Sequence, residues 1–290
     1  MHARPVLGYF VLTCGLSWGL LAVFLGMHGR WGTPAAMPVA VLYMFGPAIA
    51  AAIFQRRAER PLSELGTDLR PRRSWLAAWA LPVVISLITF ALGFTLPSVH
   101  FDASMAPFYA KLAETLPADQ VAELRAAFAK LPVHPALLAA VQAVLLGPTV
   151  NAVVAFGEEL GWRGYLFEAL KGFGFWRSSA LVGLMWGLWH APIIMLGHNY
   201  PDHPYVGVSM MIVFCLLWAP LFAWVRERSG SVGAPAVLHG TINALAGVPL
   251  MVTQGGSDLL VGVTGAVGLG VVAVANFVLF VARRRPPDPG

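Results

Sequence analysis

The sequence predicts an all-α, polytopic integral membrane protein with about eight transmembrane helices, and three observations support this prediction. Of the 290 residues, 58% are hydrophobic and only 11% are charged, whereas a soluble domain is about half apolar and a quarter charged. The mean hydropathy is +0.70. The chain also contains 30 glycines and 22 prolines, and both residues are more frequent in transmembrane helices than in soluble ones.

Eight apolar runs are long enough to cross the hydrocarbon core, which takes about 20 residues. We expect spans at 6–27, 38–55, 75–96, 135–157, 178–197, 206–225, 232–252 and 259–282. The first run lacks a small-residue cleavage site, so we expect a retained helix rather than a signal peptide. We expect residues 1–290 to form a single membrane domain. Within it, 1–134 would hold the N-terminal helices and an outside segment, and 135–252 the catalytic core helices.

The distribution of Lys and Arg predicts that both termini are cytoplasmic, because basic loops remain on that side of the membrane. With this topology, the outside segments hold four of the 19 basic residues: Arg30, Lys111, Arg125 and Lys130. The composition, rich in Ala, Gly and Arg, is typical of a bacterial source with a GC-rich genome, so we expect the protein in a bacterial inner or plasma membrane. The net charge of +5 does not indicate nucleic-acid binding, because the basic residues lie in short loops rather than on one soluble face.

The long outside connection 97–134 contains a predicted amphipathic helix within 117–131, beginning near Pro117. Its apolar residues recur at helical spacing: Val121, Leu124, Phe128 and Leu131. One interpretation is a helix that rests on the membrane surface. The other is a lid or a substrate gate.

Ionisable residues inside membrane spans are costly and indicate function. Glu158 and Glu159 follow the apolar run that starts near Pro135. Glu159 and Arg163 are four residues apart, which suits an ion pair on one helix face. Glu158 points elsewhere, without such a partner within one turn, and is a candidate general base. The alternative is that both glutamates lie at the cytoplasmic interface and simply end the span.

Two histidines lie in later spans. His190 lies within the apolar run 178–197, and Trp186 is four residues earlier on the same face. Pro192 should loosen the helix near His190. His239 and Asn243 are also four residues apart on one face. Each histidine alone also fits a packing or interhelical contact. Together, one carboxylate, two imidazoles and one amide suffice to activate water and to stabilise an oxyanion.

These three groups resemble the signature of the CAAX-processing and bacteriocin-processing intramembrane endopeptidases, also called the Abi family. That signature is Glu-Glu-x-x-x-Arg, an aromatic residue followed by x-x-x-His, and His-x-x-x-Asn/Asp. This chain has Glu158-Glu159-x-x-x-Arg163, Trp186-x-x-x-His190 and His239-x-x-x-Asn243. The second motif commonly begins with Phe, so Trp186 is a departure, which is tolerable if the ring only packs against the histidine.

The resemblance implies a role for each residue. Glu158 with His190 would activate water, and His239 with Asn243 would hold the oxyanion, while Glu159 and Arg163 would brace the helix and orient Glu158. Family members are usually called metalloproteases, which implies Zn²⁺ held by Glu158, His190 and His239. However, the sequence has no His-Glu-x-x-His motif, and using Glu158 as a ligand leaves no obvious base. Zinc and direct Glu–His water activation therefore remain equal alternatives.

The expected activity is cleavage of a membrane-associated protein or peptide by a CAAX prenyl protease-like enzyme, with the bilayer as a further partner. One alternative is a non-catalytic membrane scaffold or bacteriocin-immunity-type factor on the same fold. A small-solute transporter is a third hypothesis, but it would need two similar halves with broken helices, which the sequence lacks.

Two further expectations concern the position of the site. His190 is about 12 residues into its span, or roughly 18 Å at ~1.5 Å per residue. Glu158 would end its span on the cytoplasmic side, so a shared site would need a cavity that opens toward the cytoplasm and reaches inward. The difference in depth means either that the fourth span continues past Glu158 at a strong tilt or that the expected span boundaries are displaced. In the outside loop 197–206, we expect His198, Asp202 and His203 to be solvated residues rather than a metal site.

Overall fold

The structure, a computed structural model, describes residues 3–284, and eight helices in that range are long and apolar enough to cross a membrane. This confirms the predicted all-α polytopic fold. Seven of them are α1 (Ala3–Gly26), α2 (Ala36–Arg57), α3 (Arg73–Gly93), α9 (Phe175–Met195), α10 (Pro204–Ser229), α11 (Gly233–Ala246) and α12 (Ala266–Arg284). The remaining one is a long helical run from Pro135 to Phe173.

The helical run Pro135–Phe173 corrects the predicted span 135–157. It consists of α6 (Pro135–Leu146), a π-helical turn (Gly147–Asn151), α7 (Ala152–Glu159), a second π-helical segment (Leu160–Leu166), α8 (Phe167–Leu170) and a 3₁₀ turn (Lys171–Phe173). The prediction ended the span at the two glutamates because charge usually marks the interface. Instead, Glu158 and Glu159 are buried among neighbouring helices. The alternative in which this span continues past Glu158 is therefore correct.

Pro148 explains the first π-helical turn. Proline has no backbone N–H, so it leaves the carbonyl four residues earlier without its helical partner. Here that carbonyl, Val144 O, accepts a hydrogen bond of 2.9 Å from the indole of Trp79 on α3. The distortion is thus compensated from a neighbouring helix, as expected in a membrane protein.

The eighth span also differs from its prediction, because it begins at Ala266 rather than near 259. Residues 257–265 instead form a loop that contains Asp258 and a glycine with positive φ, Gly262. Hydropathy alone placed this loop in the span, since its other residues are mostly apolar.

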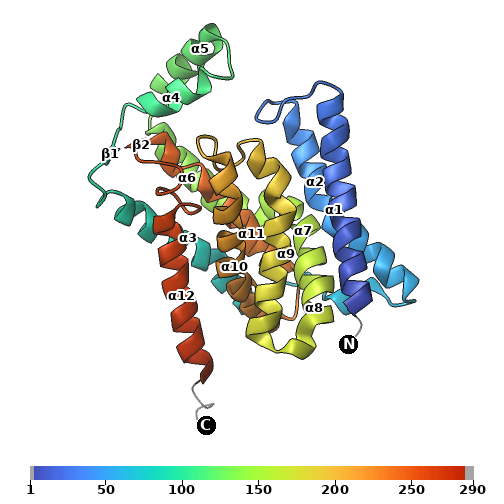
Figure 1. Cartoon of the computed structure of the whole chain (residues 1–290). Helices are drawn as coiled ribbons and strands as arrows, with labels where there is room; N and C mark the ends of the chain where they lie inside the picture. Colours follow the sequence, from blue (N-terminus) through green and yellow to red (C-terminus); the bar gives the residue numbers. More distant parts are fainter. Residues whose placement is uncertain (1–2, 285–290) are drawn as a thin grey trace.

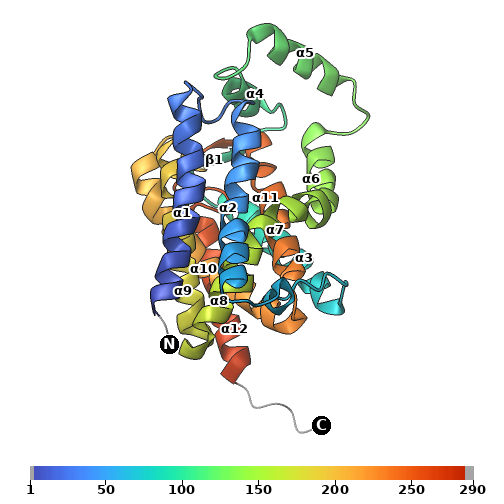
Figure 2. The same ribbon diagram turned by 90° about the vertical axis from the view of Figure 1, so that its right-hand side faces the viewer.

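The segment 97–134 contains two short helices, α4 (Ala106–Leu112) and α5 (Ala118–Ala129), and one strand of a two-stranded antiparallel sheet. The sheet pairs β1 (Val99–Phe101) with β2 (Thr253–Gly255), with Val99 opposite Gly255. Helix α5 lies within the predicted amphipathic segment, and Phe128 packs on a small cluster that includes Met105 and Ala136. Both short helices protrude beyond the bundle (Figures 1 and 2). Whether they rest on a membrane or act as a gate stays a prediction.

The helices form a bundle in which α9, α10 and α11 are central (Figures 1 and 2). In each of these three helices, at least 56% of the apolar membrane-spanning stretch is buried inside the protein, against at most 33% in the other spans. Helix α1 begins and α12 ends at one end of the bundle, which we call the basal end. The apical end is the opposite one, formed by the connections 27–35, 94–134, 196–203 and 247–265.

Helix α11 approaches the first π-helical turn very closely. A Cβ atom at Gly240 would collide with the backbone of Gly147 and Ala152, and one at Gly147 would collide with Thr241. Glycine at both positions therefore allows the backbones to touch. This contact places the helix that carries His239 and Asn243 against the helix that carries Glu158.

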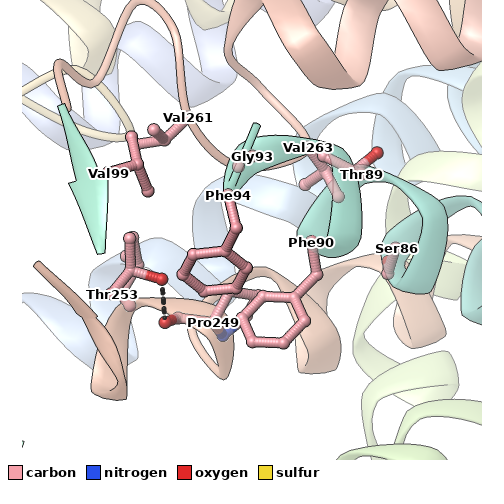
Figure 3. A pocket seen from close by; sticks show the side chains of 12 residues that line it. Ser86, Thr89, Phe90, Gly93, Phe94, Val99, Pro249, Thr253, Val261 and Val263 are labelled. Atoms are coloured by element: carbon pink, nitrogen blue, oxygen red, sulfur yellow. Dashed lines mark hydrogen bonds between the residues drawn. The ribbon is translucent and has the colours of Figure 1, made fainter. Parts of the chain in front are cut away.

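A small apolar pocket lies between α3, β1 and the segment 249–263 (Figure 3). Phe90 and Phe94 form its floor, and Thr253 Oγ1 donates a 2.7 Å hydrogen bond to Pro249 O at its edge. Its volume of about 20 Å³ is enough for roughly one water molecule. None of the motif residues line it, so it is not a candidate for the active site.

Candidate active site

One cavity brings together residues from all three sequence motifs. Glu158 from α7, His190 from α9, and His239 and Asn243 from α11 all line the same space of about 290 Å³. Glu158 is 2% exposed and His239 is 5% exposed, so both face this internal space rather than the surface. The structure thus places the four predicted catalytic residues around one cavity large enough for several atoms of a substrate.

Trp186 is in contact with residues of every motif. Its indole Nε1 donates a hydrogen bond of 2.7 Å to Glu158 Oε2. Its ring lies edge-on to His190 at 5.7 Å and to His239 at 5.5 Å between centroids. The sequence predicts only a packing role for this residue, but its N–H also binds the candidate base. The other oxygen of Glu158, Oε1, makes no hydrogen bond within residues 3–284.

Glu159 connects the first motif to the third. Its Oε1 accepts hydrogen bonds from Arg163 (3.0 Å) and from His239 Nδ1 (2.7 Å). The predicted ion pair with Arg163 is present, and both side chains are almost completely buried. Removing one partner of such a pair would leave a buried charge uncompensated. Glu159 therefore orients His239 directly, whereas the resemblance implied that it orients Glu158.

The hydrogen bonds also determine how His190 carries its proton. Its Nδ1 lies 2.8 Å from the Trp186 carbonyl oxygen, which can only accept, so Nδ1 must be the protonated nitrogen. The neutral ring then presents Nε2 as an acceptor. Pro192 lies within α9, and the Trp189 carbonyl in the preceding turn accepts hydrogen bonds from Tyr43 (2.7 Å) and Trp18 (3.0 Å). These contacts hold the loosened part of the helix in place.

Asn243 lies one helical turn after His239 on the cavity side of α11. In the described part of the chain, its side-chain amide makes no hydrogen bond, and the residue is exposed to the cavity. An amide N–H and an imidazole N–H one turn apart can donate to the same oxygen. This pair is therefore suited to bind an oxyanion.

The apical wall of the cavity contains residues that lie outside the three motifs. His198 is exposed, as expected for a solvated loop residue. It also lines the cavity and lies edge-on to Trp31, with 5.7 Å between ring centroids. Asn199 and Thr264 line the same region. These residues come from three separate connections, and no spacing pattern in the sequence relates them to the motifs.

Two of the apical loops are held together by polar contacts. His203 Nδ1 lies 2.6 Å from Asp258 Oδ1, the Asp202 N–H donates to Asp258 Oδ2, and Tyr200 donates to Thr264 O. Partial burial opposes ionisation of Asp258, but the hydrogen bonds from His203 and Asp202 outweigh it and lower the pKa of this carboxyl. Asp202 and His203 are exposed, as expected for solvated loop residues.

The cavity extends toward the apical end, whereas the expected opening lay at the end of the bundle where both termini are. Its lining includes residues of three apical connections: Trp31, His198, Asn199, Val263 and Thr264. The expected place of the opening followed from putting Glu158 at the end of a span. With α7 continuing past Glu158, the carboxylate lies midway along the run, at a depth that His190 and His239 also reach.

The residues do not form a ready metal site in this arrangement. Across residues 3–284, no three His, Cys, Asp or Glu side chains are grouped so that they could hold a metal ion. Trp186 occupies one carboxylate oxygen of Glu158. The Nδ1 atoms of His190 and His239 are hydrogen-bonded to Trp186 O and Glu159 Oε1, which leaves Nε2 of each ring as the nitrogen that could bind a metal. Zinc held by Glu158, His190 and His239 stays a prediction.

Residues 140–245 are similar to a known protein family. One curated relative is the CAAX prenyl protease 2 of Methanococcus maripaludis, which is 46% identical over 44 residues. That alignment covers 15% of this chain and 16% of the relative's length. The family match is longer, extending over residues 140–245, and includes all three motifs. The resemblance inferred from the motifs is thus confirmed: residues 140–245 of this integral membrane protein match the type II CAAX prenyl endopeptidase Rce1-like family.

Proposed function

We propose that this chain is an intramembrane endopeptidase that hydrolyses a peptide bond of a membrane-associated protein or peptide. The observation that carries the proposal is the meeting of Glu158, His190, His239 and Asn243 around one cavity within the bundle. The family match over these residues supports a CAAX protease-like activity. The enclosed position supports it further, because a water-poor site strengthens each polar interaction with the reacting groups.

The proposed reaction uses only groups of the chain and a water molecule. Glu158 takes a proton from the water, which His190 Nε2 orients, and the water oxygen attacks the peptide carbonyl carbon. The carbonyl oxygen becomes an oxyanion that accepts hydrogen bonds from Asn243 and His239. His239 can donate from Nε2 as an imidazolium, for which Glu159 supplies the opposite charge. Glu158 then returns its proton to the leaving nitrogen as the C–N bond breaks.

The decisive variant is Glu158→Gln, which keeps the size of the side chain and removes the base. We expect the cleavage rate to fall at least ~100-fold, because a general base typically contributes a factor of this size or more. New protein termini in membranes of cells carrying the wild-type chain should disappear with Glu158→Gln at matched expression. Glu123→Gln, a change of an exposed carboxylate on α5, is the control and should leave the termini unchanged.

Identical termini in the wild type and in folded Glu158→Gln would contradict the proposal and favour the scaffold or immunity-type function. A second measurement concerns the metal. Direct activation of water by Glu158 and His190 predicts that chelators leave the purified enzyme active. Activity that a chelator abolishes and Zn²⁺ restores would instead support the zinc alternative.

A further inference from the structure

The direction of the cavity is defined by its walls. Its deepest groups are Glu158, Trp186 and His239, in the middle of the bundle, and its outermost lining residues lie in apical connections. The apical lining includes His198 and Asn199, both of which are exposed. A substrate segment that enters by this route reaches the catalytic groups from the apical end.

On the basal side of Glu158, the bundle is densely packed. The guanidinium of Arg163 lies 4.0 Å from the ring centre of Phe222 and 4.3 Å from that of Trp186. Arg226 lies below it and donates to Arg163 O (3.2 Å) and to Leu65 O (3.3 Å). All five residues are at most 7% exposed. This layer separates Glu158 from the basal surface.

The two ends of the bundle differ sharply in positive charge. The apical connections contain Arg30, Lys111, Arg125 and Lys130. The basal connections and helix ends in the described range contain 13 basic residues: Arg4, Arg56, Arg57, Arg60, Arg70, Arg72, Arg73, Lys171, Arg177, Arg226, Arg228, Arg283 and Arg284. Because Lys and Arg in short loops remain in the cytoplasm, the basal end should be the cytoplasmic one.

From these three observations we propose that the active site takes its substrate from the non-cytoplasmic side of the membrane. The inference rests on the proposed peptidase function and names its substrate class. The substrate is the non-cytoplasmic part of a membrane-anchored or exported peptide, close to the bilayer surface. A protein that stays in the cytoplasm would meet the packed layer around Arg163 and Arg226 and would not reach Glu158.

The orientation of the cavity can be tested without any cleavage. The variants His198→Cys, at the apical mouth, and Ala58→Cys, at the exposed basal end of α2, are labelled with a membrane-impermeant maleimide. The native Cys14 and Cys215 are buried, so the wild-type chain provides the background. We expect His198→Cys to be labelled in spheroplasts but not in inverted membrane vesicles. Ala58→Cys should be labelled in inverted vesicles but not in spheroplasts. The reverse pattern would overturn the inference.

The side of substrate entry is tested with membrane-impermeant, quenched fluorescent peptides of mixed sequence. We expect cleavage by right-side-out vesicles and its loss in inverted vesicles, with recovery once detergent opens them. Vesicles with Glu158→Gln provide the blank. Glu158-dependent cleavage confined to inverted vesicles would overturn the inference but keep the peptidase. No such cleavage even in detergent would count against the proposed function, and the labelling pattern would still decide the orientation.

Discussion

At the scale of single residues, Trp186 shows how one side chain connects the motifs. The family pattern commonly has Phe at this position, which can pack against the histidine but has no N–H. In this chain, the indole N–H binds Glu158 Oε2. A carboxylate held by one oxygen keeps the other free for water. We therefore expect Trp186 to position the base as well as to pack against His190.

The variant Trp186→Phe separates these two roles, because it keeps an aromatic ring and removes the N–H. A hydrogen bond to a charged group contributes about 1.5–3 kcal/mol, so we expect kcat to fall by roughly tenfold or more, with little change in KM. The matched control is Trp218→Phe. Trp218 is fully buried, and its Nε1 makes no hydrogen bond in the described chain. An equal fall in kcat for both variants would show that only packing matters.

At the scale of secondary-structure elements, the site depends on the contact between α11 and the π-helical turn Gly147–Asn151. The turn exists because Pro148 interrupts the regular hydrogen-bond pattern, and Trp79 compensates for the loss. Gly240 lies in the contact, one residue after His239. A larger residue there must push α11 away from α7 and thereby separate His239 from Glu159 and Glu158.

We therefore expect Gly240→Ala to reduce both stability and activity. Overpacking of a close contact costs about 1–3 kcal/mol, which a thermal unfolding midpoint in detergent micelles would detect. Gly247→Ala is the control at the end of the same helix, since a Cβ atom there would meet nothing within 4 Å. Unchanged activity in Gly240→Ala would mean that the helix contact does not determine the catalytic geometry.

At the scale of the whole molecule, the apical loops join segments that are far apart in sequence. Asp258 binds His203 and the Asp202 N–H, and Lys111 lies near enough for attraction to both Asp202 and Asp258. The pKa of Asp258 is lowered in the folded protein. A carboxyl with a lowered pKa stabilises the fold above its ordinary pKa, about 3.9, and this contribution is lost as the pH falls below that value.

The variant Asp258→Asn tests this contribution. We expect it to have a lower unfolding midpoint than the wild type at pH 7, and the difference between the two should shrink as the pH is lowered through ~4. Asp119→Asn changes an exposed carboxylate on α5 and should match the wild type at each pH. A constant difference for Asp258→Asn across this range would show that the carboxylate charge does not hold the loops together.

The sequence by itself determined the membrane class, the approximate spans and the choice of candidate site residues. Apolar runs of about 20 residues indicate transmembrane helices, and charged residues within them are costly and therefore indicate function. For this reason Glu158, His190, His239 and Asn243 could be selected before their positions were known. The Glu159–Arg163 ion pair was also predictable, because it depends only on the spacing within one helix.

Only the tertiary structure decided where the fourth span ends, how the motifs meet and which way the cavity opens. The hydrogen bond from Trp186 to Glu158 joins residues 28 positions apart, and the contact of His239 with Glu159 joins residues 80 positions apart. Such contacts depend on how helices pack, and local spacing carries no information on packing. The sequence predicted that Glu158 and Glu159 end a span, because the partners that stabilise them lie on other helices. Those partners, Trp186 and His239, allow the two carboxylates to be buried within the bundle.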